Sequence, residues 1–208
     1  MFNWTIESGL IASYFFLSFK LSLMSLDIQV NNTVKKLKQK YENSSWQDIM
    51  NEVLEYKYFR SALTTLMKNH QNGIKFQPDF NSIFKPFDTT DFKFVKVVVI
   101  YPHALAQVPE YENKNGVLVL RSPITVSPGI NDHEIWDSYI KQLIDQISYR
   151  TIKTLFVFVG EETEKYKSVV RKGQYKMFVP LNPEFSIDKI HSAINNLLES
   201  IGKNPIVW

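Results

Sequence analysis

Residues 95–106 read Val-Lys-Val-Val-Val-Ile-Tyr-Pro-His-Ala-Leu-Ala, and this stretch decides the fold. The run from Val95 to Ile100 is apolar and largely β-branched, and Lys96 is its one charged residue. Such a run is typical of a strand that is covered on both faces, as in a parallel sheet. Tyr101 and Pro102 lead out of the run, so we expect a loop at the carboxyl end of this strand.

Strand and helix patterns alternate through the rest of the chain. Short apolar runs predict strands at residues 116–120, 155–159 and 177–179. Apolar residues at helical spacing predict helices at residues 133–147, 161–170 and 187–201, and two earlier helical patterns, one after Ser44 and one from Tyr58. Ser44 or Ser45 is expected to cap the first of these, and Asp132, His133 and Glu134 to complement the start of the helix at 133–147. The alternation predicts an α/β fold with three layers, α/β/α, around a central, mainly parallel four-stranded sheet.

Composition limits the chemistry that this chain can perform. The 208 residues suit one domain, and a hydrophobic content of 44% is enough for a core. No cysteine is present, which excludes disulfides, thiolate nucleophiles and cysteine zinc sites, and fits the reducing cytoplasm or the nucleoid. The four histidines lack the spacing of metal ligands, so we expect no metal and no cofactor. A net charge of +3 permits contact with nucleic acid.

Residues 1–44 differ from residues 45–208, and we expect an apolar and basic N-terminal extension followed by one domain. The run from Gly9 to Phe19 is apolar but Lys20 breaks it, and no basic residue precedes it. A signal peptide or a membrane anchor is therefore disfavoured. The remaining interpretation is an amphipathic or buried helix that packs on the domain or on a protein partner. The sequence leaves open whether Met1 or Met24 is the natural start.

Six blocks between residues 45 and 208 resemble, in order, the sequence blocks of the uracil-DNA glycosylase family. They are Ser45-Trp46 with Tyr58-Phe59 and Leu63, then 95–99, then 116–120 with Thr125-Val126, then Trp136, then 155–160, and finally Gly-Lys-Asn-Pro-Ile-Val-Trp at 202–208. These are framework matches, so the resemblance implies the uracil-DNA glycosylase fold more than the activity.

The same resemblance implies a pocket whose catalytic side chains are replaced. His103 falls where the family has the Asp that activates water, and Leu105 where it has the Tyr that blocks the thymine methyl group. Arg121 falls on the Asn that reads uracil, and Asn182 or Leu181 on the catalytic His. Arg121 then fills the former pocket by pairing with a carboxylate, or binds a phosphate or carboxylate ligand. The segments that carry the family's stacking Phe and its DNA-wedging Leu are also missing, near residues 108–116 and after Ser186.

We therefore expect a non-catalytic homologue that serves as a DNA-binding or protein-interaction subunit in replication, repair or a viral or mobile-element process. The resemblance implies a precedent, because a poxvirus glycosylase of this fold is a subunit of a replication processivity factor. The alternative is an active glycosylase or hydrolase with an altered substrate and a site rebuilt from His103, Arg121 and Asn182. The partner of the first role is DNA, or a replication or repair factor that docks on the apolar N-terminal segment.

One basic cluster is a candidate DNA-binding surface. It is expected around one helix and the loop after it, and comprises Lys165, Lys167, Arg171, Lys172, Tyr175 and Lys176. Lysines interleaved with tyrosines suit a surface that follows the phosphate backbone and stacks on bases. The alternative is a solvated face whose charge is offset by Glu161, Glu162 and Glu164.

Overall fold

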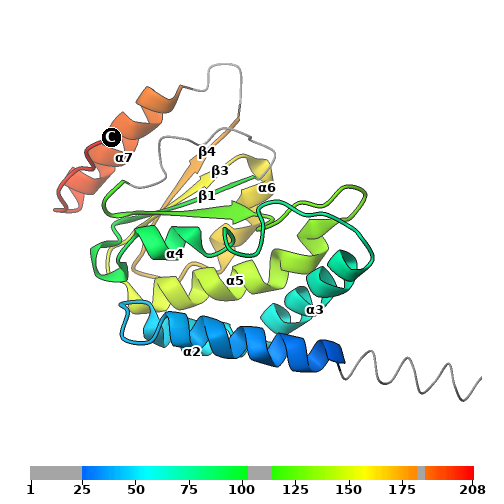
Figure 1. The fold of residues 1–208 in the computed structure, drawn as a ribbon. Coiled ribbons are helices and arrows are strands. Elements are labelled where there is room, and N and C mark those ends of the chain that lie inside the picture. The colour runs from blue at the N-terminus through cyan, green and yellow to red at the C-terminus, as the bar shows by residue number, and fades with distance from the viewer. Residues whose placement is uncertain (1–24, 103–113, 182–185) are drawn as a thin grey trace, which may run out of the picture.

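The computed structural model describes residues 25–102, 114–181 and 186–208. These residues form a parallel sheet in the order β2-β1-β3-β4 (Figure 1). The strands are β1 (Val97–Pro102), β2 (Val117–Ser122), β3 (Leu155–Val159) and β4 (Tyr175–Val179). Helices cover both faces of the sheet, so the predicted three-layer α/β/α architecture is confirmed.

The register brings the starts of the four strands to one level. Val97 pairs with Val117 and with Leu155, and Leu155 pairs with Tyr175. Because all four strands run in the same direction, their carboxyl ends meet at the opposite side of the sheet. We call these two sides the N-terminal edge and the C-terminal edge.

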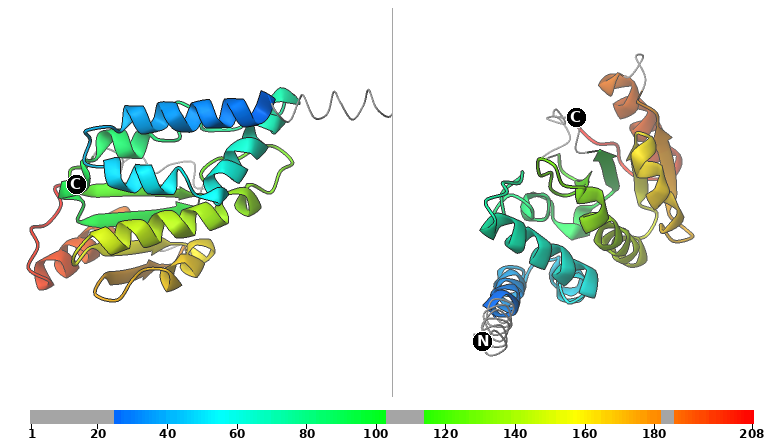
Figure 2. Two further views of the ribbon diagram at one scale, coloured as in Figure 1. Left: turned by 90° about the horizontal axis from the view of Figure 1, so that it is seen from below. Right: turned by 90° about the vertical axis from the view of Figure 1, so that its right-hand side faces the viewer.

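The larger of the two cores lies on the face of the sheet that Val98 and Ile100 share with alternate residues of β2 and β3. The helices that pack on this face are α5 (Asp132–Arg150), α3 (Lys57–Gln71) and α2 (Gln47–Val53). Figure 2 shows these helices gathered on one side of the sheet. Trp46 anchors the outer part of this core, where its indole N–H donates to the carbonyl of Thr90 at 2.6 Å.

The opposite face is covered by α7 (Ile187–Ser200) and the C-terminal segment. Val97, Val99 and Tyr101 of β1 point to this side. Asn195 of α7 exchanges two hydrogen bonds with the backbone of Ile206, at 2.8 and 3.0 Å, which fixes the C-terminal segment on the helix. The interiors of β1, β2 and β3 are therefore dry on both sides, as the apolar runs predicted, whereas β4 at the edge of the sheet is only partly buried.

The helix of residues 25–40 packs on the larger core. Val30 and Val34 are buried there, and Tyr41 donates a 2.9 Å hydrogen bond to Asp88. Lys38 pairs with Glu55 of the segment after α2. The described part of residues 1–44 is thus in contact with the rest of the chain, and the division at residue 44 stays a prediction. Within the described ranges, no helix has the length and apolar character needed to cross a membrane.

Several local predictions were wrong in detail. Neither Ser44 nor Ser45 caps α2: Ser44 Oγ accepts from the N–H of Trp46, which precedes the helix, and Ser45 Oγ accepts from Phe92. The helix predicted at 161–170 is a short α6 (Glu161–Glu164) followed by the 3-10 helix η2 (Lys165–Ser168). The short elements α4 (Lys85–Thr89) and η1 (Phe92–Phe94) were not predicted, because they lack an apolar periodicity of their own.

Burial of Val34 makes a first testable prediction. Val34→Ala removes two methyl groups from a side chain that is 2% exposed, so the free energy of unfolding should fall by about 2 kcal/mol. The neighbouring exposed residue gives the control: Lys35→Ala should stay within about 0.5 kcal/mol of the parent. Urea denaturation of both variants measures the difference, and equal effects would show that this helix does not stabilise the fold.

Candidate functional site

The carboxyl ends of the strands bring the candidate site residues to the C-terminal edge. Ligands of open parallel α/β sheets bind at this edge, because the loops that follow the strands meet there. Of the four positions expected in the former pocket, the structure places Arg121 at the end of β2. His103, Leu105 and Asn182 lie outside the described residues.

Arg121 brings a permanent positive charge to the C-terminal edge. It pairs in register with Tyr101 on the face of the sheet that α7 covers. Its guanidinium lies 5.6 Å from the centroid of the Tyr101 ring, within the range of a cation–π interaction. Arg121 thus places a cationic guanidinium beside an aromatic ring at the end of β2.

A cavity of about 280 Å³ lies beside β2, the outer strand of the sheet. Its wall is mainly apolar, and Lys85 and Arg121 are among the residues that line it. The cavity is lined by residues of β2, of α4 and the segment before it, and of α5. Its chemistry suits an apolar group next to a negative charge.

An apolar contact covers the carboxyl end of β3. Gly160 has a φ of +77°, and a Cβ placed there would lie 2.8 Å from Leu181 Cδ1 and 3.5 Å from Pro102 Cγ. A larger residue at position 160 would be strained by this backbone conformation, and its Cβ would require Leu181 to shift. Leu181 and Pro102 thus occupy the space above β3, between the ends of β1 and β4.

Buried polar side chains connect the end of β2 to η2 and α5. The hydroxyl groups of Ser122 and Tyr166 lie 2.7 Å apart, and Tyr166 is fully buried. Burial raises the pKa of Tyr166, so the phenol stays protonated. Burial also raises the pKa of Asp137, but hydrogen bonds from Lys141, Lys165 and Tyr166 more than offset this and hold it below its usual value. Asp137 is therefore an ionised carboxylate that neighbouring side chains already neutralise.

Asp132 organises the loop after β2. Its carboxylate accepts from the Ser127 N–H at 2.6 Å and from the Thr125 hydroxyl at 3.0 Å, while Thr125 accepts from the Trp136 indole at 2.7 Å. Asp132 and Glu134 lie in the first turn of α5, as the expected complement to the helix dipole, but no side-chain hydrogen bond caps this helix and the Asp132 carboxylate is turned to the loop. The sequence showed an acid at a helix start, and nothing in it revealed that the acid is 4% exposed beneath this loop.

The basic candidates are spread along the segment between β3 and β4 and the start of β4. This segment crosses from the C-terminal edge to the N-terminal edge: η2 carries Lys165 and Lys167, Lys172 precedes β4, and Tyr175 and Lys176 are the first two residues of β4. Three members are held by carboxylates: Lys165 by Asp137 at 2.7 Å, Lys167 by Glu164 at 3.6 Å and Arg171 by Asp145 at 2.8 Å.

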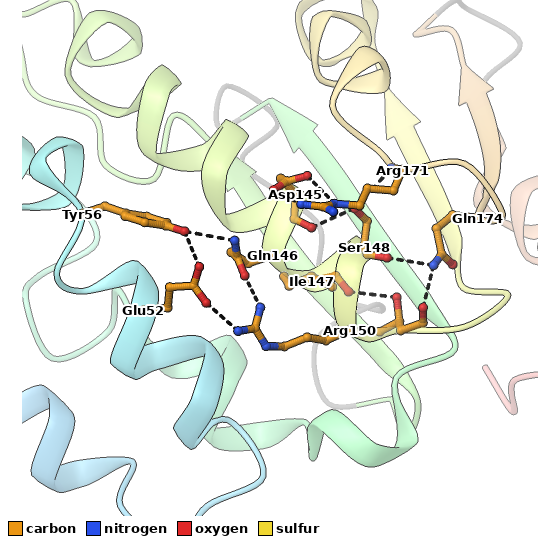
Figure 3. A network of polar contacts seen from close by, with 10 residues as sticks. Glu52, Tyr56, Asp145, Gln146, Ile147, Ser148, Arg150, Arg171 and Gln174 are labelled. Atoms are coloured by element: carbon orange, nitrogen blue, oxygen red, sulfur yellow. Dashed lines mark hydrogen bonds and ion pairs between the residues drawn. The ribbon is translucent and has the colours of Figure 1, made fainter.

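Arg171 belongs to a structural network that joins α2, α5 and the turn before β4 (Figure 3). Its guanidinium forms two parallel hydrogen bonds with Asp145 and stacks on Tyr149, 4.4 Å from the ring centroid. Arg150 links Gln146 to Glu52, and Glu52 accepts a 2.6 Å hydrogen bond from Tyr56. Burial and this carboxylate raise the pKa of Tyr56 to about 12. Arg171 thus links α5 to the turn before β4, and its role as a DNA contact stays a prediction.

No acidic, histidine or cysteine cluster of metal-binding size occurs among residues 25–102, 114–181 and 186–208. The chemistry that these residues offer is thus cationic and apolar: Arg121 with Lys85 at one side of the edge, and Leu181 with Pro102 above β3.

Comparison with known proteins supports the fold. No protein-family model matches the chain. The crystal structure of mimivirus uracil-DNA glycosylase matches with a TM-score of 0.63 and 16% identity, covering 79% of this chain and 86% of that one. Two point variants of mimivirus UNG in complex with UGI match with TM-scores of 0.64 and 0.65 and identities of 16% and 17%, covering 79% of this chain and 87% of theirs. The expected resemblance to the uracil-DNA glycosylase fold is confirmed.

Removal of the Asp132 charge tests the loop network. Asp132→Asn replaces an acceptor of three hydrogen bonds with an amide that accepts through one oxygen, so the free energy of unfolding should fall by about 3 kcal/mol. The control is Glu134→Gln, an exposed acid two residues further on, which should change stability by less than about 0.5 kcal/mol. If urea denaturation gives equal values for both variants, Asp132 does not hold the loop.

The network in Figure 3 predicts a dependence on acid pH. The hydrogen bond from Tyr56 and the pairing with Arg150 lower the pKa of Glu52, although burial opposes them. A carboxylate whose pKa is lowered by folding stabilises the fold at pH values above its pKa in the unfolded chain. This contribution is lost as the pH falls through the pKa that the group has in the folded protein. As the pH drops from about 5 to about 3, the free energy of unfolding should therefore fall less for Glu52→Gln than for the parent. The difference should be less than about 1 kcal/mol, because the Glu52–Arg150 pair is partly exposed.

Urea titrations at several pH values measure this difference. Glu42→Gln, an exposed acid outside the network, is the control and should follow the parent curve. A Glu52→Gln curve that also follows the parent would contradict the assignment.

Proposed function

We propose that this chain is a non-catalytic homologue of the uracil-DNA glycosylases that serves as a DNA-binding or protein-interaction subunit. The process it serves is DNA replication, DNA repair or the propagation of a virus or mobile element. The observation that carries the proposal is the position of Arg121: a permanent cation stacked on Tyr101 at the end of β2, where the sequence resemblance implies an uncharged amide that reads uracil.

The charge at the C-terminal edge has the wrong sign for cleavage of a glycosidic bond. The departing sugar develops a positive charge, which a fixed carboxylate stabilises and a nearby guanidinium destabilises. Two carboxylates near this edge are already held, Asp137 by two lysines and Asp132 by the loop of Thr125 and Ser127. In the sequence, His103 replaces the family's Asp, and a histidine supplies no fixed negative charge.

Base flipping provides a second argument. Extrusion of a base costs a few kcal/mol, which contacts in the pocket must offset. Arg121 replaces the amide that would read the base, and the chain between Val108 and Gly116 is too short to carry the family's stacking ring. Binding to DNA without extrusion of a base avoids this cost.

Contact with DNA is assigned to Lys172 and Lys176, because Lys165, Lys167 and Arg171 pair with carboxylates of their own chain. Lys172 and Lys176 are exposed before and at the start of β4, whereas Tyr175 is half-buried against the core that α7 covers. Two exposed lysines suit contact with phosphates, and the base-stacking role expected for Tyr175 is not part of this assignment. A protein partner, where one takes part, is assigned to the apolar N-terminal segment before residue 25.

An excision assay tests the non-catalytic role. Purified protein is incubated with uracil-containing single-stranded and double-stranded oligonucleotides, beside an active uracil-DNA glycosylase as positive control. We expect no excision above background from the parent or from His103→Ala. Excision by the parent that His103→Ala abolishes would overturn the proposal in favour of a hydrolase that uses His103, Arg121 and Asn182.

Binding to the same oligonucleotides tests the DNA-binding role. The affinity should fall as salt rises, and Lys172→Gln/Lys176→Gln should reduce the slope of log K against log salt by about 1.4 on single strands. Lys35→Gln/Lys36→Gln, on the exposed side of the helix of residues 25–40, is the charge-matched control and should leave the slope unchanged. Absence of binding at low salt would leave the protein-interaction role alone.

A further inference from the structure

A row of lysines lies along the N-terminal edge of the sheet, opposite the candidate site. Each strand is preceded by a lysine within one to three residues: Lys96 before β1, Lys114 before β2, Lys153 before β3 and Lys172 before β4. Because the four strands start at one level, these lysines are brought to the same side. The end of α7 and the C-terminal segment lie at this side too, away from the arrowheads (Figures 1 and 2).

Hydrogen bonds join the segments of two of these lysines, Lys96 and Lys153, to the segment of Lys203, and we call Lys96, Lys153 and Lys203 the edge lysine cluster. Lys203 Nζ donates to the carbonyl of Ile152, the residue before Lys153, at 3.2 Å. Lys96 Nζ donates to the carbonyl of Asn204, the residue after Lys203, at 3.2 Å. These bonds join three segments that are far apart in sequence, and the charges of Lys96 and Lys153 both act on Lys203.

The clustering of these charges is unfavourable in the protein alone. Burial lowers the pKa of Lys203, and the charges of Lys96 and Lys153 lower it further. The charged groups that act on Lys203 are thus both of its own sign. Like charges held close destabilise a fold, whereas a bound anion that contacts all three would remove the repulsion.

Exposed apolar side chains border the cluster. Phe94, two residues before Lys96, is 58% exposed, and Ile152, next to Lys153, is 81% exposed. The backbone of Phe94 and the aliphatic stem of Lys96 meet at Gly116, where a Cβ would lie 3.1 Å from the Phe94 carbonyl and 3.5 Å from Lys96 Cδ. An aromatic ring exposed beside lysines offers a flat surface on which a base can stack.

We propose that the edge lysine cluster binds the phosphates of a single-stranded nucleic acid and that Phe94 stacks on one of its bases. The inference rests on the proposed function only in taking nucleic acid as the anion, and it names residues and a surface that differ from the former pocket. Lys172 lies at the same edge, because Gln174 ties the turn before β4 to the carbonyl of Thr151 and the N–H of Thr154. A strand on the cluster can therefore continue toward the start of β4.

Nucleic acid fits this surface better than an acidic protein segment does. Both supply negative charges, but a nucleic acid also supplies flat bases that pair with an exposed phenylalanine. Aspartate and glutamate side chains satisfy the lysines and leave Phe94 and Ile152 without a role. The exposed ring therefore decides between the two kinds of partner.

The experiment measures binding of a fluorescent oligothymidine to the full chain over a range of salt concentrations. Lys153→Asn/Lys203→Gln should weaken binding roughly ten-fold and reduce the slope of log K against log salt by about 1.4, whereas Lys35→Gln/Lys36→Gln should change neither. Phe94→Ala should weaken binding about five-fold or more with an unchanged slope. Polyglutamate of matched length serves as a competitor, and its affinity should be the same for the parent and for Phe94→Ala.

Thermal unfolding separates binding from stability. Lys153→Asn removes a repulsive charge, and asparagine tolerates the positive φ of 53° at this position, so the melting temperature should stay the same or rise by about 1 °C. Weaker binding by a variant that is equally stable supports a contact with the nucleic acid. Weaker binding that merely follows a lower melting temperature overturns it.

The remaining outcomes are distinct. Binding that Lys153→Asn/Lys203→Gln leaves intact but Lys172→Gln/Lys176→Gln reduces overturns this inference and leaves the proposed function standing. Tighter binding of polyglutamate than of oligothymidine, with no effect of Phe94→Ala, overturns it in favour of an acidic protein partner. Absence of any oligothymidine binding overturns both this inference and the DNA-binding role, whatever the excision assay shows.

Discussion

The constraint on which this structure depends is that β1 has to be dry on both faces. All six residues from Val97 to Pro102 are buried. One face needs α5 with α3 and α2, and the other needs α7 with the C-terminal segment, because an apolar strand exposed on either side would lose its main source of stability. The three layers, the parallel direction of the strands and the position of the C-terminal segment all follow from the need to cover both faces of β1.

A sheet buried in this way leaves polar chemistry to its two edges, and the two edges of this protein differ. At the C-terminal edge Leu181 and Pro102 cover β3, and Arg121 adds a cation beside Tyr101. At the N-terminal edge the edge lysine cluster gathers charges of one sign. The fold is that of the uracil-DNA glycosylases, but a fold sets only where such edges lie, and the side chains at the edges determine what they bind.

Pairing decides which charges are available to a partner. Lys165, Lys167 and Arg171 are adjacent in sequence to Lys172 and Lys176, yet the first three face carboxylates of their own chain. A lysine or arginine that is already paired with a carboxylate adds little to the attraction of a polyanion, because the carboxylate repels the polyanion unless it is displaced. The net charge of +3 therefore understates the basic character of the N-terminal edge.

The sequence by itself determined the strands, the long helices and the layers of this protein, because burial imposes a local pattern: β-branched runs for dry strands, and apolar residues at helical spacing for α3, α5 and α7. It also predicted, from the order of the blocks alone, that His103, Leu105 and Arg121 stand where the uracil-DNA glycosylases have other residues, and this stays a prediction. Tertiary structure alone decided that the Asp132 carboxylate binds the loop after β2 and that Asp145 forms the ion pair with Arg171. It also decided that the segments of Lys96, Lys153 and Lys203 lie side by side. The physical reason is range. Burial acts along each segment and leaves a periodic trace in the chain, whereas a charge interacts with whatever the fold brings within a few ångströms of it, however distant in sequence.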